Sequence, residues 1–486
     1  MRPVMRSLSL KTALLTCACM IAAPASAETL KDALWQAYTS NPQLEAARAQ
    51  LRATDENVPI QRSSGLPSLT TSSTLTEFLK SSSTSFTSPE RQLSANVDLG
   101  VPIYSGGSVR NGIRAAENRV EAGRADLRGS ESALFSQVVA AYMDVIRNEA
   151  VVGLSSNNVD VLVINLEATT DRFEIGDLTR TDVAQSASRL ALARSDFRSA
   201  QANLVSAREN YIALVGSAPD DLQPPPPLPG LPTSPDDAVN VALEYNPDLI
   251  AARERAEASG YEIEVAGAGR QPRLEAFASG GYQNYLGTLD SIPGTASASQ
   301  TSTSAQAGLR LSLPIFQGGR VSAQQRQAQA QSSAALEQVI GTERNVIAQV
   351  RAAYSSWRAA NAIIASTQAA VDAAELSLEG VRAENSIGNR QILDVLNAEQ
   401  ELLAARVQLV TARRNEYVAG FTLLAAMGRA EARDLGLDSE GPLYDPVANY
   451  DRSRDILLDW QSDPDPVATS TRTVDIPAQD GEVSPD

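Results

Sequence analysis

The charged residues most able to interact with one another cluster around two glycines, in a stretch that occurs twice. The first copy runs from Arg172 to Val183, and the second runs from Arg382 to Val395. Carboxylate and guanidinium groups at these positions can form ion pairs. The aligned pairs, 212 residues apart, are Ile175-Gly176 with Ile387-Gly388 and Asp182-Val183 with Asp394-Val395. Because glycine permits a tight turn between helices, each copy is predicted to be the tip of a helical hairpin.

Residues 1–27 have the pattern of a secretory signal peptide. Three basic residues precede a short apolar run from Thr12 to Ala23, and Ala25-Ser26-Ala27 is a small-residue cleavage site. The run is too short to span a bilayer as a helix, and the residues before Cys17 and Cys19 do not match a lipoprotein signal. We therefore expect export and cleavage after residue 27.

Cleavage would leave a chain without cysteine or histidine and would change the net charge from −17 to −20. This composition excludes disulfides, metal sites built from histidine and cysteine, and histidine-based catalytic triads. The sequence contains no paired catalytic site, so we expect neither an enzyme nor a cofactor. The strong acidic balance also argues against binding to nucleic acid.

The chain is built from two similar halves. Asn41-Pro42 recurs as Asn246-Pro247 at an offset of 205 residues, and each pair predicts a break in the short helix, with the main helix beginning at the proline. Two predicted strand-to-helix turns recur at an offset of 212, namely Pro102-Ile103-Tyr104 with Gly106-Gly107 and Pro314-Ile315-Phe316 with Gly318-Gly319. Proline and paired glycines let a chain turn from a strand into a helix. The change of offset places a seven-residue insertion between residues 274 and 314.

These repeats divide the chain after the signal peptide into four parts. They are a first repeat (28–222), a proline-rich linker (223–235), a second repeat (236–430) and an acidic tail (431–486). Each repeat is expected to hold a short helix (29–60, 236–268), a β-hairpin, a long outgoing helix (107–173, 319–386) and a returning helix (178–214, 390–427). At about 1.5 Å per residue, an outgoing helix extends roughly 100 Å, which is typical of a coiled coil or helical barrel. The tail carries 14 acids against 4 basic residues and is expected to be partly disordered.

Residues 93–101 and 307–313 alternate between apolar and polar side chains, which predicts strands with one apolar face. The partner strands, about 68–79 and 274–285, have a weaker pattern. Long loops rich in serine, threonine and glycine (80–92 and 286–305) separate the strands. The pattern fits a hairpin of an outer-membrane protein and equally a hairpin of a soluble β-sandwich. Outside the signal, no segment approaches 18 consecutive apolar residues, so a membrane location would require a closed β-barrel.

The order, spacing and duplication of these motifs resemble the TolC family of outer-membrane export channels over about residues 29–428. The resemblance implies an α+β membrane protein that forms a homotrimer. Each chain would give four strands to a shared twelve-stranded antiparallel β-barrel, because four strands cannot close a barrel alone. The long coiled-coil hairpins would continue the barrel as a periplasmic tunnel. The implied partners are a periplasmic adaptor (membrane fusion) protein, an inner-membrane pump and outer-membrane lipid.

Carried onto this chain, the resemblance implies a periplasmic gate at Thr181, Asp182, Arg390, Asp394 and Asn397. Arg390 on one hairpin is expected to bridge to Asp182 on another, and three copies of Asp394 would form an anionic ring. Asn397 stands where the family often has a second acid, and Asn385 stands where a gate tyrosine is expected, so the gate is expected to be weaker. The implied adaptor-docking tips are Ile175, Gly176, Asp177, Ile387, Gly388 and Asn389. Without the resemblance, these charges would be interpreted as ordinary solvated ones.

Two classes of function follow from the sequence. The leading one is the exit duct of a tripartite efflux or type I protein secretion system, with either proteins or small toxic molecules as cargo. The rival is a soluble periplasmic coiled-coil scaffold, in which the predicted strands would pack as a small sheet.

Overall fold

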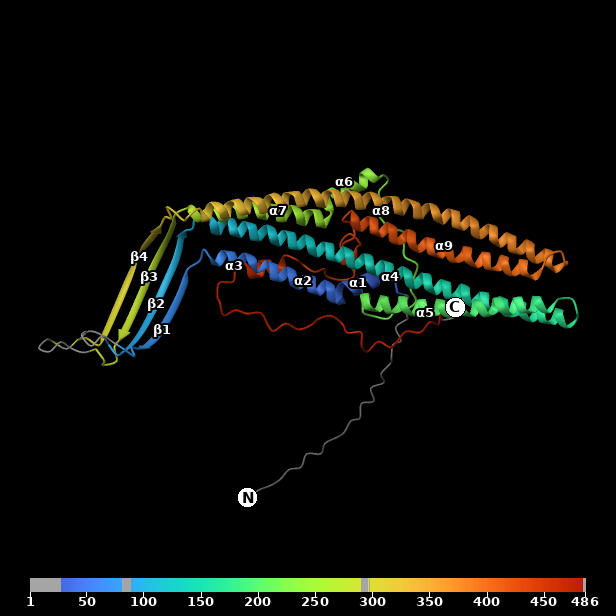
Figure 1. The fold of residues 1–486 in the computed structure, drawn as a ribbon, viewed down its shortest axis with the longest axis horizontal. Helices are drawn as coiled ribbons and strands as arrows, with labels where there is room; N and C mark the ends of the chain where they lie inside the picture. The colour runs from blue at the N-terminus through green and yellow to red at the C-terminus, as the bar shows by residue number, and fades with distance from the viewer. Residues whose placement is uncertain (1–27, 81–88, 290–295, 297, 484–486) are drawn as a thin grey trace, which may run out of the picture.

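The computed structural model describes residues 28–80, 89–289, 296 and 298–483. The expected signal peptide therefore lies outside the described residues. The molecule is elongated, with a β-sheet at one end and the tips of two long helical hairpins at the other (Figure 1). Among the described residues, no helix is both long enough and apolar enough to cross a membrane.

The first half contains three short helices, two strands and one helical hairpin. Its elements are α1 (Leu30–Ser40), α2 (Pro42–Asp55), α3 (Asn57–Ser63), β1 (Ser68–Glu77), β2 (Arg91–Tyr104), α4 (Ser108–Glu174) and α5 (Arg180–Val215). Over 29–60 the chain breaks at Asn41, as the Asn-Pro pair predicted, and breaks again at Glu56, which was not predicted. The break at Asn41 follows from Pro42, which stands at the first position of α2 and has no N–H to donate.

The second half repeats this order without a third short α-helix. Its elements are α6 (Pro235–Tyr245), α7 (Pro247–Gly267), a short 3₁₀ helix η1 (Ala268–Arg270), β3 (Arg273–Asn284), β4 (Thr301–Ser312), α8 (Arg320–Ser386) and α9 (Ile392–Ala426). The outgoing helices α4 and α8 each contain 67 residues. Two short helices follow in the tail, η2 (Leu437–Ser439) and α10 (Ala448–Ser453).

The four strands form one antiparallel sheet in the order β1-β2-β3-β4, so the two halves of the chain pair directly through β2 and β3. The register places Leu69, Leu99, Ala278 and Ala307 in one row across the sheet, on one face. The neighbouring row, on the opposite face, consists of Thr70, Asp98, Ser279 and Gln306. The sheet therefore has an apolar face and a polar face, as the period-two alternation predicted.

A duplicated asparagine fastens the short helices to the returning helices. Asn41 accepts a hydrogen bond from the N–H of Gln43 at 2.9 Å and donates through Nδ2 to the carbonyl of Leu214 at 2.8 Å. Asn246 repeats this arrangement and donates to the carbonyl of Ala426 at 3.0 Å. Each asparagine thus caps the start of one helix and binds a carbonyl at the end of another.

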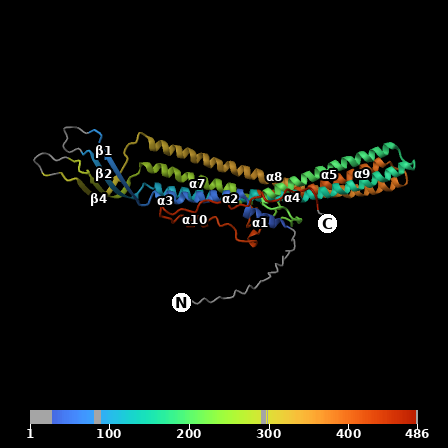
Figure 2. The same ribbon diagram turned by 90° about the horizontal axis from the view of Figure 1, so that it is seen from below.

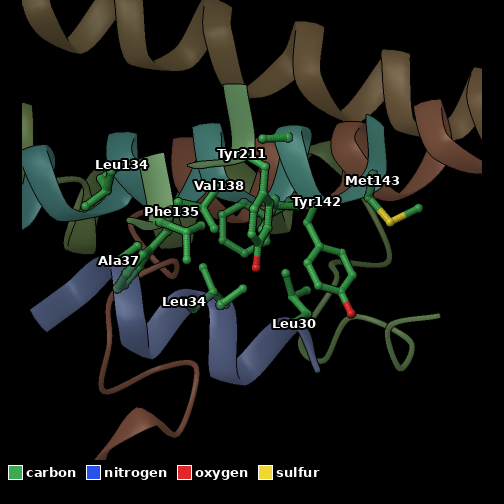
Figure 3. Close-up of a cluster of buried hydrophobic side chains, with 14 of the residues drawn as sticks. Leu30, Leu34, Ala37, Leu134, Phe135, Val138, Tyr142, Met143 and Tyr211 are labelled. Atoms are coloured by element: carbon green, nitrogen blue, oxygen red, sulfur yellow. The ribbon is translucent and has the colours of Figure 1, made fainter. Parts of the chain in front are cut away.

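The largest hydrophobic cluster lies midway along the molecule, where α1 packs on α4 and α5 (Figure 3). Phe135 and Tyr211 are fully buried there. The hydroxyl of Tyr211 donates to Oε1 of Glu28 at 2.6 Å, and the hydroxyl of Tyr142 donates to the carbonyl of Gln223 at 2.7 Å. These bonds hold Glu28, two residues before α1, and the start of the proline-rich linker against the same cluster.

The tail leaves α9 and returns along the outer side of the short helices towards α5 (Figures 1 and 2). Arg62 of α3 contacts Asp455 at 3.0 Å, and Arg208 of α5 donates to the carbonyl of Glu482 at 3.1 Å. The sequence predicted a partly disordered tail, and the structure describes it through residue 483 as mostly irregular chain outside η2 and α10. Leu458 and Trp460 are exposed.

Candidate functional site at the hairpin tips

The first tip is a short turn built around Gly176. Helix α4 ends at Glu174, and the chain reverses at Gly176. The φ of Gly176 is 85°, a value that residues with a Cβ rarely adopt. The N–H of Asp177 donates to the carbonyl of Arg172 at 2.9 Å, which satisfies a carbonyl at the helix end. The side chains of Arg172 and Asp177 also form an ion pair, with Nη2 of Arg172 at 2.7 Å from Oδ2 of Asp177.

A capping box starts the returning helix of this hairpin. The side chain of Thr179 accepts from the N–H of Asp182 at 3.3 Å, and Oδ2 of Asp182 accepts from the Thr179 N–H at 2.9 Å and from its hydroxyl at 2.7 Å. These hydrogen bonds, first from the hydroxyl and then from the backbone, lower the pKa of Asp182. Asp182 therefore remains ionised and ordered at the start of α5, and Thr181 beside it is exposed.

The second tip repeats the turn with different side chains. Gly388 has a φ of 81°, and the N–H of Asn389 donates to the carbonyl of Glu384 at 2.9 Å. Nδ2 of Asn385 donates to the carbonyl of Arg390 at 2.8 Å across the turn. Gln391, which precedes α9, makes no side-chain capping bond. The second returning helix thus begins without the cap that the first one has.

Arg390 pairs within its own hairpin. Its Nε contacts Oε2 of Glu384 at 2.7 Å and its Nη1 lies 3.9 Å from Oδ2 of Asp394. The hydrogen bond and charge of Glu384, followed by the charge of Asp394, raise the pKa of Arg390. Within this single chain, Arg390 and Asp182 are each engaged in their own tip, and the bridge between hairpins stays a prediction.

The two hairpins are joined near the tips by a buried carboxylate. Glu399 on α9 is 6% exposed. Nδ2 of Asn165 on α4 donates to both of its oxygens, at 3.0 and 2.9 Å, and Nη2 of Arg382 on α8 donates to Oε1 at 3.0 Å. Three long helices thus meet at one side chain. We refer to Glu399, Asn165 and Arg382 as the Glu399 junction.

A second contact between the hairpins lies beside this junction. Nη2 of Arg189 on α5 donates to Oδ1 of Asn397 at 2.7 Å, and Nη1 of Arg189 donates to Gln400. Leu396, which is buried, packs against Leu162 and Leu190 of the first hairpin. Asn397, one of the expected gate residues, therefore contacts the first hairpin in this chain.

The structure brings together a different set of side chains from the expected gate. Asp394 and Arg390 lie in one tip and Thr181 and Asp182 in the other, and of the expected gate residues Asn397 alone takes part in the polar links described above, through Arg189. The other residues of those links, which the sequence reasoning did not identify, are Asn165, Arg189, Glu399 and Gln400, and Arg382 holds Glu399 from within the second hairpin. One signal was present, because Glu399 interrupts the apolar stripe of α9 formed by Val395, Leu396 and Leu402.

The two strand-to-helix turns contain consecutive glycines in the left-handed conformation. Gly106 and Gly107 have φ values of 67° and 86°, and Gly318 and Gly319 have values of 59° and 80°. Pro102 lies within β2, where the register with β3 shifts. Strand β2 ends at Tyr104, three residues beyond the predicted end at residue 101. Pro314 follows β4, which ends at Ser312. The glycine pairs turn the chain from the sheet into α4 and α8.

Comparison with known families identifies this arrangement. The family described as "Outer membrane efflux protein" matches residues 33–217 and 238–429, which cover both repeats. The chain belongs to this family. It is therefore an outer-membrane efflux channel protein whose helical part lies largely in the periplasm. The resemblance to the TolC family is confirmed. The family assignment overturns the alternative of a soluble scaffold.

The chain is similar to individual relatives over most of their length. The chain is 34% identical over 431 residues to the outer membrane efflux protein BepC of Brucella suis biovar 1 (strain 1330), covering 89% of this chain and 91% of BepC. It is 27% identical over 429 residues to the outer membrane protein TolC of Escherichia coli (strain K12), covering 87% and 86%. The solved structure of VceC from Vibrio cholerae has the same fold, with a TM-score of 0.70 at 24% identity over 82% of this chain and 96% of VceC.

Proposed function

We propose that three copies of this chain form the exit duct of a tripartite efflux or type I secretion system. The observation that carries the proposal is the sheet, in which β1 and β4 lie at the edges and one face is apolar. A four-stranded sheet is too small to close on itself. Three such sheets joined edge to edge would give a twelve-stranded barrel with its apolar face towards lipid and its polar face towards the lumen.

The long helices support an assembly of several chains. Within the described chain, α4 buries 21 of its 67 residues, whereas α8 buries 9 of 67. Helix α8 also exposes large apolar side chains along its length, namely Leu336, Ile340, Ile363 and Leu376. Apolar residues on a long helix of this kind are expected to be covered by another helix. In the proposed trimer, a helix of the neighbouring chain covers this face.

The tips are the proposed docking site for a periplasmic adaptor. Ile175 is 80% exposed and Ile387 is 72% exposed, each beside the glycine of its turn. Two exposed isoleucines surrounded by polar residues offer small apolar anchors to a partner. The gate would lie next to these two isoleucines, where Arg390 of one hairpin approaches Asp182 of a neighbouring chain and Asp394 faces the threefold axis of the proposed trimer.

Photo-crosslinking in living cells tests the docking site. A crosslinking residue in place of Ser386, beside the second tip, is expected to capture a periplasmic adaptor. The matched control is Ser333, which is exposed on the same helix but lies roughly 80 Å away at about 1.5 Å per residue. The control is expected to capture no adaptor.

The identity of the captured protein separates the two cargo classes. Capture of an adaptor from an ABC-type secretion system would support protein export, and capture of an adaptor from a proton-driven pump would support small-molecule efflux. Capture of an adaptor at Ser333 but not at Ser386 would refute docking at the tips.

Recovery of only monomeric protein after mild detergent extraction and chemical crosslinking would refute the trimer.

A further inference from the structure

The tail forms a closed loop at the end of α10, which we call the apolar loop (residues 452–463). Nη1 and Nη2 of Arg452 donate to Oδ1 and Oδ2 of Asp463, at 2.8 and 2.9 Å, and this two-point contact closes the loop. Inside it, the N–H of Gln461 donates to the carbonyl of Leu458 at 3.2 Å. The loop therefore has a defined shape, although most of it is neither helix nor strand.

The apolar loop directs its large apolar side chains outwards. Leu457 and Leu458 are each 65% exposed, and Trp460 is 96% exposed. The other two tryptophans of the chain, Trp35 and Trp357, are partly buried. Single apolar side chains on a surface are ordinary, but a cluster of three on a closed loop indicates a surface that another molecule covers.

Arg62 of α3 holds the apolar loop beside the end of the sheet. Its Nη1 donates to the carbonyl of Arg454 at 2.7 Å and to Oδ1 of Asp455 at 3.0 Å. Helix α3 ends at Ser63, and β1 begins at Ser68. Figure 1 shows the tail turning back next to α3, towards the end of the molecule that holds the sheet. The loop therefore lies near the point where the sheet gives way to helices.

The apolar face of the sheet extends to this same end. Its last row consists of Tyr104, Leu274 and Leu311, which pair across β2, β3 and β4. Tyr104 and Leu311 are exposed. In the proposed barrel this row would mark the boundary between lipid and periplasm, where tyrosine and tryptophan are favoured. The apolar loop is thus continuous, along the length of the molecule, with the surface proposed to face lipid.

We propose that the apolar loop inserts Leu457, Leu458 and Trp460 into the periplasm-facing leaflet of the outer membrane. The inference rests on the proposed barrel, because the barrel sets the height of the lipid. Tryptophan suits this boundary, since its ring is apolar and its N–H can still bond to water or a headgroup. The two leucines would reach the acyl chains. Through Arg62, the inserted loop would also tie α3 to the membrane.

The charges of the loop indicate which headgroups it tolerates. Asp455 is paired with Arg62 and Asp463 with Arg452, so both acids have local counter-charges. Asp459 adds a negative charge between Leu458 and Trp460 in the sequence. An acid at this place is repelled by anionic lipid. We therefore expect insertion among zwitterionic headgroups, such as phosphatidylethanolamine.

Spin labelling of the full-length protein in vesicles of phosphatidylethanolamine and phosphatidylcholine tests the insertion. The chain has no cysteine beyond residue 27, so Leu458→Cys creates a single labelling site. Oxygen concentrates in lipid, whereas a nickel chelate stays in water. The ratio of oxygen to nickel accessibility should be at least about fivefold higher at this site than at the control Val474→Cys. Val474 is exposed in the same tail, three residues after Thr471, which lies beside Gly216 at the end of α5.

A third label, Val97→Cys on the apolar face of β2, tests the barrel separately. Lipid contact at Val97 with water contact at Leu458 would overturn the insertion and leave the barrel intact. Water contact at Val97 would refute the barrel and the insertion together. Low accessibility of Leu458 to both reagents would show that a neighbouring chain covers the loop, which also overturns the insertion. All three labelled positions are exposed in the described chain, so the substitutions should not disturb folding.

Discussion

Replacing Gly428 with alanine is expected to abolish the folded protein. Gly428 follows α9 with a φ of 72°, and a Cβ there would lie 2.6 Å from the carbonyl carbon of Tyr245 and 2.9 Å from the nitrogen of Asn246. These are backbone atoms held by the asparagine contact to Ala426, so they cannot move aside cheaply. A left-handed alanine alone costs about 1 kcal/mol. With the clash added, we expect a loss of more than about 4 kcal/mol.

The measurement is the amount of trypsin-resistant protein in the outer-membrane fraction. For Gly428→Ala we expect at least a tenfold decrease. Gly436→Ala is the matched control, because Gly436 has a φ of 68° in the same tail but a Cβ there would meet no atom within 4 Å. It should lower the amount of folded protein only slightly. Equal losses in both variants would show that backbone conformation, rather than the close approach to α6 and α7, sets the requirement for glycine.

Replacing Glu399 with glutamine is expected to loosen the second hairpin from the first. The carboxylate accepts from Asn165 and Arg382, whereas an amide turns one acceptor into a donor and removes the charge that faces the arginine. Loss of a buried charge-assisted hydrogen bond costs about 1–3 kcal/mol. Amide hydrogens of α9 near this position should therefore exchange roughly 5- to 150-fold faster, as hydrogen-exchange mass spectrometry would measure.

The control for this variant is Glu401→Gln, which makes the same chemical change at an exposed position on the same helix. Exchange in α9 should be unchanged. If the Glu399 junction also restrains the proposed gate, channels containing Glu399→Gln should show a higher conductance in planar bilayers than those containing Glu401→Gln. Unchanged exchange in both variants would show that the apolar contacts of Leu396 hold the hairpins together without the junction.

Much of the architecture could be predicted from the sequence, because the same local sequence motifs occur in both halves of the chain. The glycines at the tips and the two glycine pairs fixed the ends of the long helices to within a residue or two, and period-two alternation located the second strands. The additional break at Glu56 was missed, because α3 starts there without a capping side chain or a preceding glycine. The sheet order could not be read locally, since β2 and β3 are far apart in the chain.

The contacts of the site were less predictable for a related reason. The capping box of Thr179 and Asp182 is a local pattern, and it gives Asp182 a structural task that was overlooked beside its expected role in the gate. The Glu399 junction joins residues 234 positions apart, so no spacing rule connects Asn165 with Glu399. An acid in an apolar helical stripe indicates that a partner exists but does not identify it.

The equal length of α4 and α8 has a geometric consequence. Both helices leave the sheet through the same kind of glycine turn and contain 67 residues, so their tips end at one height and form a level rim. Deleting one residue from α8 alone would lower its tip by about 1.5 Å and rotate it by about 100°. The seven-residue difference between the halves lies between residues 274 and 314, before α8 begins, and leaves the rim level. A longer or shorter version of the proposed tube therefore requires matched changes in both repeats, preferably in steps of two helical turns.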